Sequence, residues 1–398
     1  MGLWRNLFSS SYRAARAAEA AGNHDLAAQQ YALAGERADA VRMHLARAAR
    51  AHDRAGEIAA LREAVHWAGD DPALLKNASA ALGRALLGKA LAEGVATARD
   101  RERVREAAAL LTAGGEHREA GAALATIGDH QGAAAAYSTG GLVELTEAAL
   151  AEDERVSGRA HVARDAFADY ELHLRLGRRD DARAALVRCL EEAPDREHRR
   201  LLDELEARII TSAKVELRPR GRPAIVISAR PTAIIGRDPL CELALRPGSV
   251  SRHHAAIGVE AQGGGPRFTV RDAGSRNGTL IGGLPIAGTM PLAERGTVEL
   301  SEDCRLAYEV AGEPPLLVVT VASGLDRGRL LVVAAPDQVI DLRRLDLPCD
   351  LVFTAGRPLL GRPGGTLLLG DTPIATGRAQ LVVGDTVTLD GLVIEVAG

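Results

Sequence analysis

The sequence predicts a multidomain fold in which an α-solenoid of helical hairpins precedes two β-sandwiches. Up to about residue 209 the chain is rich in Ala, Leu, Glu and Arg and almost free of proline, a composition typical of helices. From about residue 212, β-branched residues alternate with polar ones between Gly and Pro turns, which is typical of short strands. A chain of 398 residues is long enough for two or three cores. We expect domains at residues 1–210, 213–311 and 316–398.

Glycines divide the helical region into short units. Gly115, Gly128 and Gly141 follow one another at intervals of 13 residues, and Gly115 and Gly128 each precede a polar residue that can begin the next helix. Helices of about ten residues must stack on neighbours to bury their apolar faces. The segment 176–194 resembles part of a tetratricopeptide (TPR) repeat, although the unit spacing here is shorter than the 34 residues of a strict repeat. We therefore expect TPR-like helical hairpins.

One stretch of the helical region imitates a nucleotide-binding loop. Residues 83–89 have the Gly-x4-Gly-Lys skeleton of a phosphate loop. Ala90 stands where a hydroxyl residue would bind Mg²⁺, and the preceding residues 72–82 have a helical pattern where a phosphate loop needs a strand. These two features exclude nucleotide hydrolysis.

Three polar clusters lie at the ends of expected strands between Ile235 and Thr279. They comprise Gly236 and Arg237; Ser251, Arg252 and His254; and Arg276, Asn277, Gly278 and Thr279. Arginine supplies a fork of donors that matches phosphate oxygens, and a serine hydroxyl adds a donor at shorter range. An asparagine amide both donates and accepts, as a peptide backbone requires. The set is suited to binding one phosphate and the peptide that carries it.

In their order and spacing these clusters resemble the forkhead-associated (FHA) domain, a β-sandwich that reads phosphothreonine. The family pattern of Gly-Arg, Ser-x-x-His and Asn-Gly occurs in order within about residues 214–311. The resemblance implies that Arg237, Ser251 and Arg252 contact the phosphate. It also implies that Asn277 bonds the peptide backbone and that Arg276 tunes the choice of flanking residues. The residues with an implied supporting role are Gly236, His254, Gly278 and Thr279.

A hydrolase triad of Ser251, His254 and Asp272 is a competing interpretation of the same stretch. The serine lies in the run 248–252, which reads Gly-Ser-Val-Ser-Arg. It therefore lacks the Gly-x-Ser-x-Gly elbow that exposes a nucleophilic serine in α/β-hydrolases. We expect no catalytic residue in this chain.

The C-terminal segment repeats features of the first sandwich. Gly274 to Leu280 aligns with Gly361 to Leu367, and Gly296 to Leu300 aligns with Asp385 to Leu389. In the second copy Gly364 replaces the asparagine, and the Ser-Arg-His-His region is missing. We expect a degenerate FHA-like β-domain that binds no phosphate and packs on the first sandwich or on a partner.

The composition limits the classes of partner. A net charge of −4 argues against a general nucleic-acid binder. The four cysteines show no metal-ligand spacing, so we expect reduced, buried thiols in a cytoplasmic protein, with no metal and no cofactor. No apolar run reaches the roughly 20 residues of a membrane helix, so we expect no membrane contact. The abundance of Arg over Lys, together with the abundance of Ala, is typical of a bacterial genome of high GC content.

The predicted function is that of an adaptor in bacterial Ser/Thr kinase signalling. The expected partners are a phosphothreonine-containing protein, either a Ser/Thr kinase or its substrate, and a second protein on the helical repeats. A transcription regulator is an alternative, but the first hundred residues show no wing strands and no basic recognition helix. A structural scaffold with a vestigial phosphate pocket is the other alternative.

Overall fold

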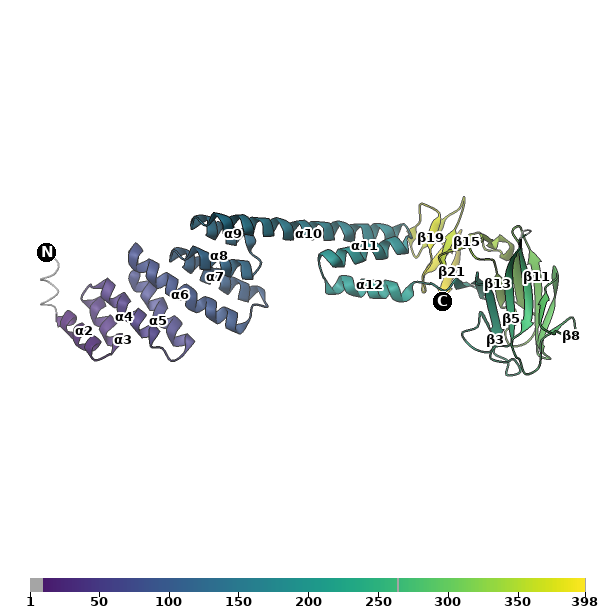
Figure 1. The fold of residues 1–398 in the computed structure, drawn as a ribbon, viewed down its shortest axis with the longest axis horizontal. Coiled ribbons are helices and arrows are strands. Elements are labelled where there is room, and N and C mark those ends of the chain that lie inside the picture. The colour runs from purple at the N-terminus through teal and green to yellow at the C-terminus, as the bar shows by residue number, and fades with distance from the viewer. Residues whose placement is uncertain (1–9, 263–264, 398) are drawn as a thin grey trace. The chain divides into compact units, whose positions relative to one another are not determined.

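The computed structural model describes residues 10–262 and 265–397 of the chain. Helices occupy the first part of the described chain and strands occupy the second (Figure 1). Contacts within the chain divide it into two compact units, Met1–Gly158 and Arg159–Gly398. Each unit is described by itself below.

The described residues contain eleven helices. Their bounds are α2 (Ser10–Ala20), α3 (His24–Leu33), α4 (Arg37–Ala49), α5 (Arg54–Ala68), α6 (Pro72–Glu93), α7 (Ala98–Ala113), α8 (His117–Thr126), α9 (His130–Thr139), α10 (Val143–Arg175), α11 (Arg179–Glu192) and α12 (Arg196–Arg208). The expected glycine turns are confirmed, because Gly115, Gly128 and Gly141 lie between helices with φ of +77°, +74° and +68°. That backbone region is one that residues with a Cβ rarely adopt.

In the first unit, polar side chains cap the helices and small residues let them approach closely. Asp53 and Asp129 accept hydrogen bonds from backbone N–H groups at the starts of α5 and α9. Gly83, the first residue of the Gly-x4-Gly-Lys run, lies inside α6, so the run forms no loop. A Cβ at Gly83 would lie 2.8 Å from Cγ of Leu111 on α7, which explains the glycine as a packing residue.

The second unit begins within α10 and joins two helices to a β-region. Asp385, which is 6 % exposed, accepts a hydrogen bond of 3.0 Å from the backbone N–H of Val382. Arg208 of α12 donates to the same carboxylate at 3.0 Å, and Arg179 of α11 lies 3.4 Å from it. The backbone N–H of Gln380 donates to the carbonyl of Gly177 in the turn between α10 and α11. Helices α11 and α12 are therefore fixed to the C-terminal strands.

The strands follow from Lys214 to the end of the described chain. Their bounds are β1 (Lys214–Pro219), β2 (Ile225–Ser228), β3 (Thr232–Gly236), β4 (Leu243–Ala244), β5 (Ala255–Gln262), β6 (Gly265–Asp272), β7 (Leu280–Ile281), β8 (Leu284–Pro285), β9 (Thr289–Pro291), β10 (Arg295–Ser301), β11 (Cys304–Ala311), β12 (Leu316–Val321), β13 (Leu330–Val333), β14 (Ile340–Asp341), β15 (Asp350–Thr354), β16 (Arg357–Gly361), β17 (Leu367–Leu369), β18 (Thr372–Pro373), β19 (Arg378–Gln380), β20 (Thr386–Leu389) and β21 (Leu392–Ala397). A short 3₁₀ helix, η1 (Leu342–Leu345), follows β14.

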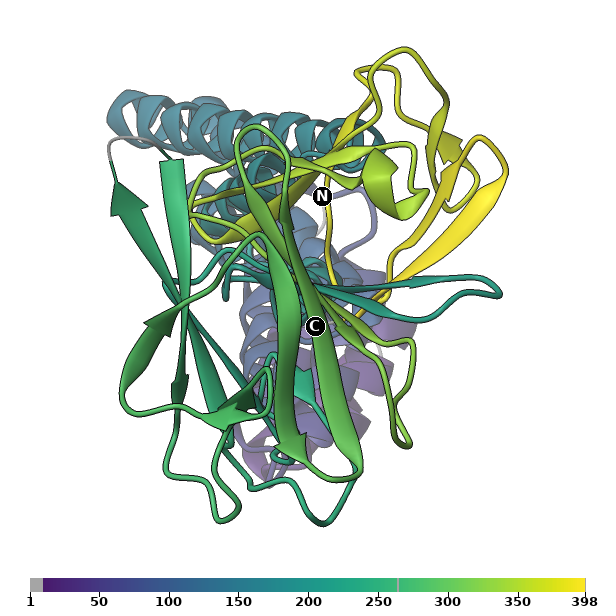
Figure 2. The same ribbon diagram turned by 90° about the vertical axis from the view of Figure 1, so that its right-hand side faces the viewer.

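These strands form two sandwiches (Figure 2). The sandwiches share one sheet of 12 strands. In the first sandwich the sheet β4-β3-β5-β6-β9 packs on β13-β12-β11-β10-β7-β8, with Ile257 and Leu317 in its core. In the second sandwich the sheet β14-β15-β16-β19 packs on β18-β17-β20-β21-β1-β2, with Leu217 and Leu360 in its core. The shared sheet is continuous because β2 pairs with β13.

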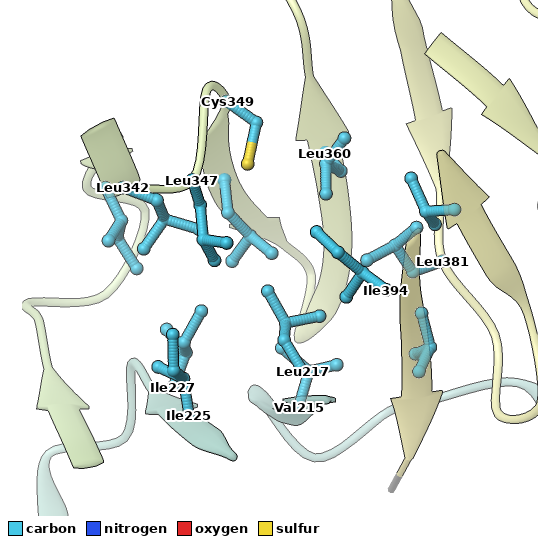
Figure 3. Packing of buried hydrophobic residues seen from close by; sticks show 14 of the residues in the cluster. Val215, Leu217, Ile225, Ile227, Leu342, Leu347, Cys349, Leu360, Leu381 and Ile394 are labelled. Carbon is cyan, nitrogen blue, oxygen red and sulfur yellow. The ribbon is translucent and has the colours of Figure 1, made fainter. Parts of the chain in front are cut away.

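The two sandwiches exchange strands. Strands β1 and β2 come first in the chain but belong to the second sandwich, where β1 pairs with β21. Strands β12 and β13 come later and belong to the first sandwich, where β12 pairs with β11. At the centre of the shared sheet, β2 and β13 run parallel, and each strand has one face in the first core and the other face in the second. In β2, Val226 faces the first core, whereas Ile225 and Ile227 face the second. Figure 3 shows Ile225 and Ile227 pointing into the same interior as Leu360. Burial of both faces explains why the first three residues of β2 are all apolar.

Candidate functional site

Three loops of the first sandwich meet at a cleft of about 550 Å³. One loop follows β3, one precedes β5 and one follows β6. The cleft is lined by all five of the predicted contact residues, namely Arg237, Ser251, Arg252, Arg276 and Asn277. The fold therefore brings together clusters that are separated in the sequence.

The first loop is joined to the second by backbone contacts. The N–H of Arg237 donates to the carbonyl of Ser251 at 2.9 Å, and the N–H of Asp238 donates to the carbonyl of Arg252 at 3.0 Å. Gly236, the last residue of β3, lies so close that a Cβ there would overlap the carbonyl oxygen of Arg252. Only glycine allows this approach, and the approach places Arg237 beside Ser251.

The third loop meets the second through polar side chains. Oγ of Ser251 accepts a hydrogen bond of 3.0 Å from the backbone N–H of Arg276, so the hydroxyl proton is left to donate elsewhere. Nδ2 of Asn277 donates to the carbonyl of Ser249 at 2.9 Å. Among the described residues, Oδ1 of Asn277 has no protein partner, and it can accept a hydrogen bond from a ligand.

His254 is buried and joins the second loop to the third. Its side chain is 0 % exposed. Nδ1 accepts a hydrogen bond of 3.1 Å from the N–H of Ser251, so the ring proton resides on Nε2, which donates to the carbonyl of Gly278 at 3.1 Å. Burial lowers the pKa of His254 below its ordinary value, so the ring is neutral near pH 7. Both ring nitrogens are therefore engaged by backbone groups, and its supporting role stays a prediction.

Asp272 organises the third loop. Its Oδ1 accepts from the hydroxyls of Ser275 and Thr279 at 2.5 and 2.7 Å. Its Oδ2 accepts from the N–H groups of Gly274 and Ser275, each at 2.9 Å. Burial acts to raise the pKa of Asp272, but the hydrogen bonds from Ser275, Thr279 and Gly274 outweigh it and lower the pKa to about 2. The ionised carboxylate therefore fixes the loop that presents Arg276 and Asn277.

The cleft carries positive charge that nothing in its lining neutralises. Arg237, Arg252 and Arg276 are all exposed. Within residues 10–262 and 265–397, none of their guanidinium groups has a hydrogen-bond or ion-pair partner, and no carboxylate lines the cleft. Unpaired guanidinium groups around a hydroxyl donor are suited to an oxyanion.

A model of the forkhead-associated (FHA) family matches residues 233–304, the span that holds all three loops. These residues form an FHA domain. Among curated protein sequences, none matches this chain.

Solved structures similar to the chain include FHA domains from several proteins. The FHA domain of the CT664 protein from Chlamydia trachomatis is 25% identical over 22% of this chain and 89% of that chain, with a TM-score of 0.18. The FHA domain of FhaA, solved with the intracellular domain of Rv3910, is 28% identical over 22% of this chain and 90% of that chain, with a TM-score of 0.17. Mycobacterium tuberculosis EmbR, solved with a low-affinity phosphopeptide, is 14% identical over 75% of this chain and 69% of that chain, with a TM-score of 0.18.

The FHA domain does not arrange Ser251, His254 and Asp272 as a triad. Oγ of Ser251 accepts from Arg276, whereas His254 uses its ring nitrogens on backbone groups. Asp272 bonds Ser275 and Thr279 in place of the histidine. FHA domains are binding modules, and in the described chain the hydroxyl of Ser251 has neither an imidazole nor a carboxylate as a hydrogen-bond partner.

No cluster of three or more His, Cys, Asp or Glu that could hold a metal ion occurs in the described residues. The four cysteines are free and buried, as the sequence predicts. Of the helices in the described ranges, none combines the length and the apolar character that crossing a membrane requires.

Asp272 was not among the residues that the sequence predicts for the FHA domain, because the pattern suggests it only as a member of a triad. The structure places this carboxylate under the third loop with four hydrogen bonds. The local sequence could have indicated this role, because an Asp shortly before Gly274 and Ser275 favours a turn that the aspartate side chain closes.

Acid is expected to destabilise the FHA domain through His254. Because burial lowers the pKa of the folded-state ring, the unfolded chain binds the proton more readily, and stability falls as pH drops below about 6.5. We expect His254→Gln to lose about 1–3 kcal/mol near pH 7, since Ser251 and Gly278 lose a partner, and to show a weaker decline towards pH 5. Thermal unfolding of both proteins across this pH range measures the difference. His44, whose pKa burial also lowers, is common to both proteins. Equal declines would exclude His254 as the source.

Proposed function

We propose that this chain is a phosphothreonine-peptide-binding adaptor in Ser/Thr kinase signalling. One observation supports this above all others. Arg237, Arg252 and Arg276 converge, without protein partners in the described chain, on a cleft that also holds the hydroxyl of Ser251 and a free acceptor on Asn277. The family match to residues 233–304 supports the same function.

Selectivity for phosphate follows from charge. Phosphorylation gives threonine a charge of about −1.5 to −2 and three strong acceptor oxygens. Arg237, Arg252 and the hydroxyl of Ser251 supply charge-assisted and short hydrogen bonds to these oxygens. An unphosphorylated threonine offers none of these acceptors, so the guanidinium groups would gain nothing from leaving water. The same cleft therefore discriminates a kinase product from its precursor.

A peptide library tests the proposed function. The full chain is screened against phosphothreonine peptides, with the same sequences unphosphorylated and with phosphoserine in place of phosphothreonine. We expect retention of phosphothreonine peptides only. Failure to retain any phosphopeptide would favour a scaffold with a vestigial pocket.

Asn277→Ala is expected to weaken phosphopeptide binding more than it weakens the binding of inorganic phosphate. The reason is that Oδ1 of Asn277 is free to accept from a peptide N–H, which inorganic phosphate lacks. Loss of one such hydrogen bond to a neutral group corresponds to about 0.5–1.5 kcal/mol. Titration calorimetry with each ligand gives the two affinities. Equal losses would contradict a role in gripping the peptide backbone.

We propose that the second sandwich is a degenerate copy of the FHA domain. The strand order β18-β17-β20-β21-β1-β2 has the same pattern of antiparallel pairings as β8-β7-β10-β11-β12-β13, although β21 and β1 are not joined by a turn as β11 and β12 are. The loop after β16, which matches the loop carrying Asn277, has Gly364 at that position. Arg362 of this loop is paired with Asp390, so it is not free for a phosphate.

The helical region is the proposed site for a second protein partner. Capture from the source cell with the full chain, compared with Arg237→Ala, separates the two kinds of partner. Partners of the phosphate cleft are expected to be lost with Arg237→Ala and after phosphatase treatment. Partners of the helices are expected to remain.

A further inference from the structure

The loop that carries Ser251 and Arg252 is held by a hairpin that lies outside the FHA match. This hairpin joins β12 to β13 through a tip at residues 322–329. Asp326 in the tip is 4 % exposed. Its Oδ2 accepts the backbone N–H of Arg246 at 2.7 Å, and its Oδ1 accepts Nε of the same arginine at 2.7 Å.

Further contacts join the hairpin tip to the same loop and to the sandwich. The guanidinium of Arg246 also donates to the carbonyl of Leu325, and Nη1 of Arg329 donates to the carbonyl of Ala244 at 2.5 Å. On its other side the tip is held by the start of β11, since the N–H of Ala322 donates to the carbonyl of Arg305 at 2.9 Å. The hairpin tip is therefore a fixed support for Arg246.

The chain between Arg246 and Ser251 has little freedom to absorb a displacement. Immediately before it, the N–H of Leu245 donates to the carbonyl of Gly236 at 2.8 Å. Immediately after the turn at Pro247, Val250 is 1 % exposed and lies in the first core. A shift of Arg246 would therefore strain the short link to Ser251, whose carbonyl and hydroxyl bond the other two loops.

We propose that Asp326 is a positioning residue of the phosphopeptide cleft, acting through Arg246 and touching no ligand. The FHA domain would then take part of its site from a segment beyond residue 304, the end of its family match. The effect on peptide affinity rests on the proposed function. The effect on the geometry of the loop does not.

A purely stabilising role is the competing explanation, because a buried carboxylate with an arginine partner is often structural. The chain contains a matched control. Asp385 is 6 % exposed and also accepts a backbone N–H, that of Val382, and an arginine, Arg208. It lies in the second sandwich, away from the three loops.

The experiment compares Asp326→Ala, Arg246→Ala and Asp385→Ala in the full chain. Amide hydrogen exchange is followed at Arg237 and Arg276, whose N–H groups both donate to Ser251. Affinity is measured with a phosphothreonine peptide retained in the library screen. We expect Asp326→Ala to accelerate exchange at both amides and to weaken affinity by about tenfold or more.

The other two variants are expected to change amide exchange and peptide affinity less than Asp326→Ala does. Arg246→Ala keeps its backbone bond to Asp326, so we expect a smaller change than in Asp326→Ala. Asp385→Ala is expected to lower the melting temperature while leaving the two amides and the affinity at wild-type values. Where Asp326→Ala fails to fold, Asp326→Asn replaces it, since the amide oxygen still accepts the N–H of Arg246 but carries no charge.

Two results would overturn the proposal. One is wild-type exchange at Arg237 and Arg276 in the folded Asp326 variant. The other is an equal change in the Asp326 and Asp385 variants, which would show a general loss of stability. If the wild type retains no phosphopeptide, the proposed function fails, and the exchange data still decide whether Asp326 positions the loop.

Discussion

Replacing Arg237 by alanine is expected to weaken phosphothreonine-peptide binding by about 100-fold or more, measured by titration calorimetry. The guanidinium lines the cleft and has no protein partner in the described chain, so its hydrogen-bonding capacity is free for a phosphate. For the same reason its removal breaks no contact in the fold. We expect the free energy of unfolding to stay within about 0.5 kcal/mol of the wild type.

Arg267→Ala is the matched control for this prediction. Arg267 is an exposed arginine on β6 of the same domain, but it does not line the cleft. Arg267→Ala and Arg237→Ala remove the same positive charge from the domain. A comparable loss of affinity in both variants would therefore show that binding depends on net charge alone. If calorimetry gave Arg237→Ala the affinity of the wild type for the phosphothreonine peptide, Arg237 would not be a phosphate contact.

The local features of this chain could be predicted from the sequence because their causes are local. Alternation of apolar and polar residues predicts strands near residues 232–235, 254–259 and 267–271, and the structure has β3, β5 and β6 there. Glycines such as Gly128 mark the helix turns because the turn requires positive φ. The three polar clusters could be placed at strand ends, and the structure brings them to one cleft. Their contacts with a ligand stay predictions.

The exchange of strands could not be predicted in the same way. The alternation in Val215 and Leu217 is the same whether β1 pairs with β11 or with β21. The choice depends on β21, whose residue Ala397 pairs with Glu216, and an internal repeat makes the two possible partners alike in pattern. The contact between Asp326 and Arg246, which lie 80 residues apart, was missed for this reason. The domain boundaries at 311 and 316 stay a prediction, with strands from both sides in both cores.

This exchange of strands leads to the second large effect that we expect. A fragment of residues 213–311, cut at the predicted domain boundary, is expected to be unfolded or aggregated. It lacks β12 and β13, and with them five side chains that are at most 2 % exposed in the first core: Leu317, Val319, Val321, Leu331 and Val333. Burial of each is worth about 1.5–3 kcal/mol, and their sum is comparable with the whole stability of a domain, about 5–15 kcal/mol.

The second compact unit, Arg159–Gly398, provides the control fragment, since it contains both sandwiches with the helices that Asp385 binds. We expect this fragment to unfold cooperatively and to retain phosphopeptide binding, as measured by circular dichroism and calorimetry. The sharpest contrary result would be a folded 213–311 fragment that binds the peptide. In that fragment β1 and β2 would have to take the places of β12 and β13 beside β11, because they are the strands whose partners β21 and β13 have been removed. The β1–β2 and β12–β13 hairpins would then be interchangeable. Strands would be exchanged only where both sandwiches are present in one chain.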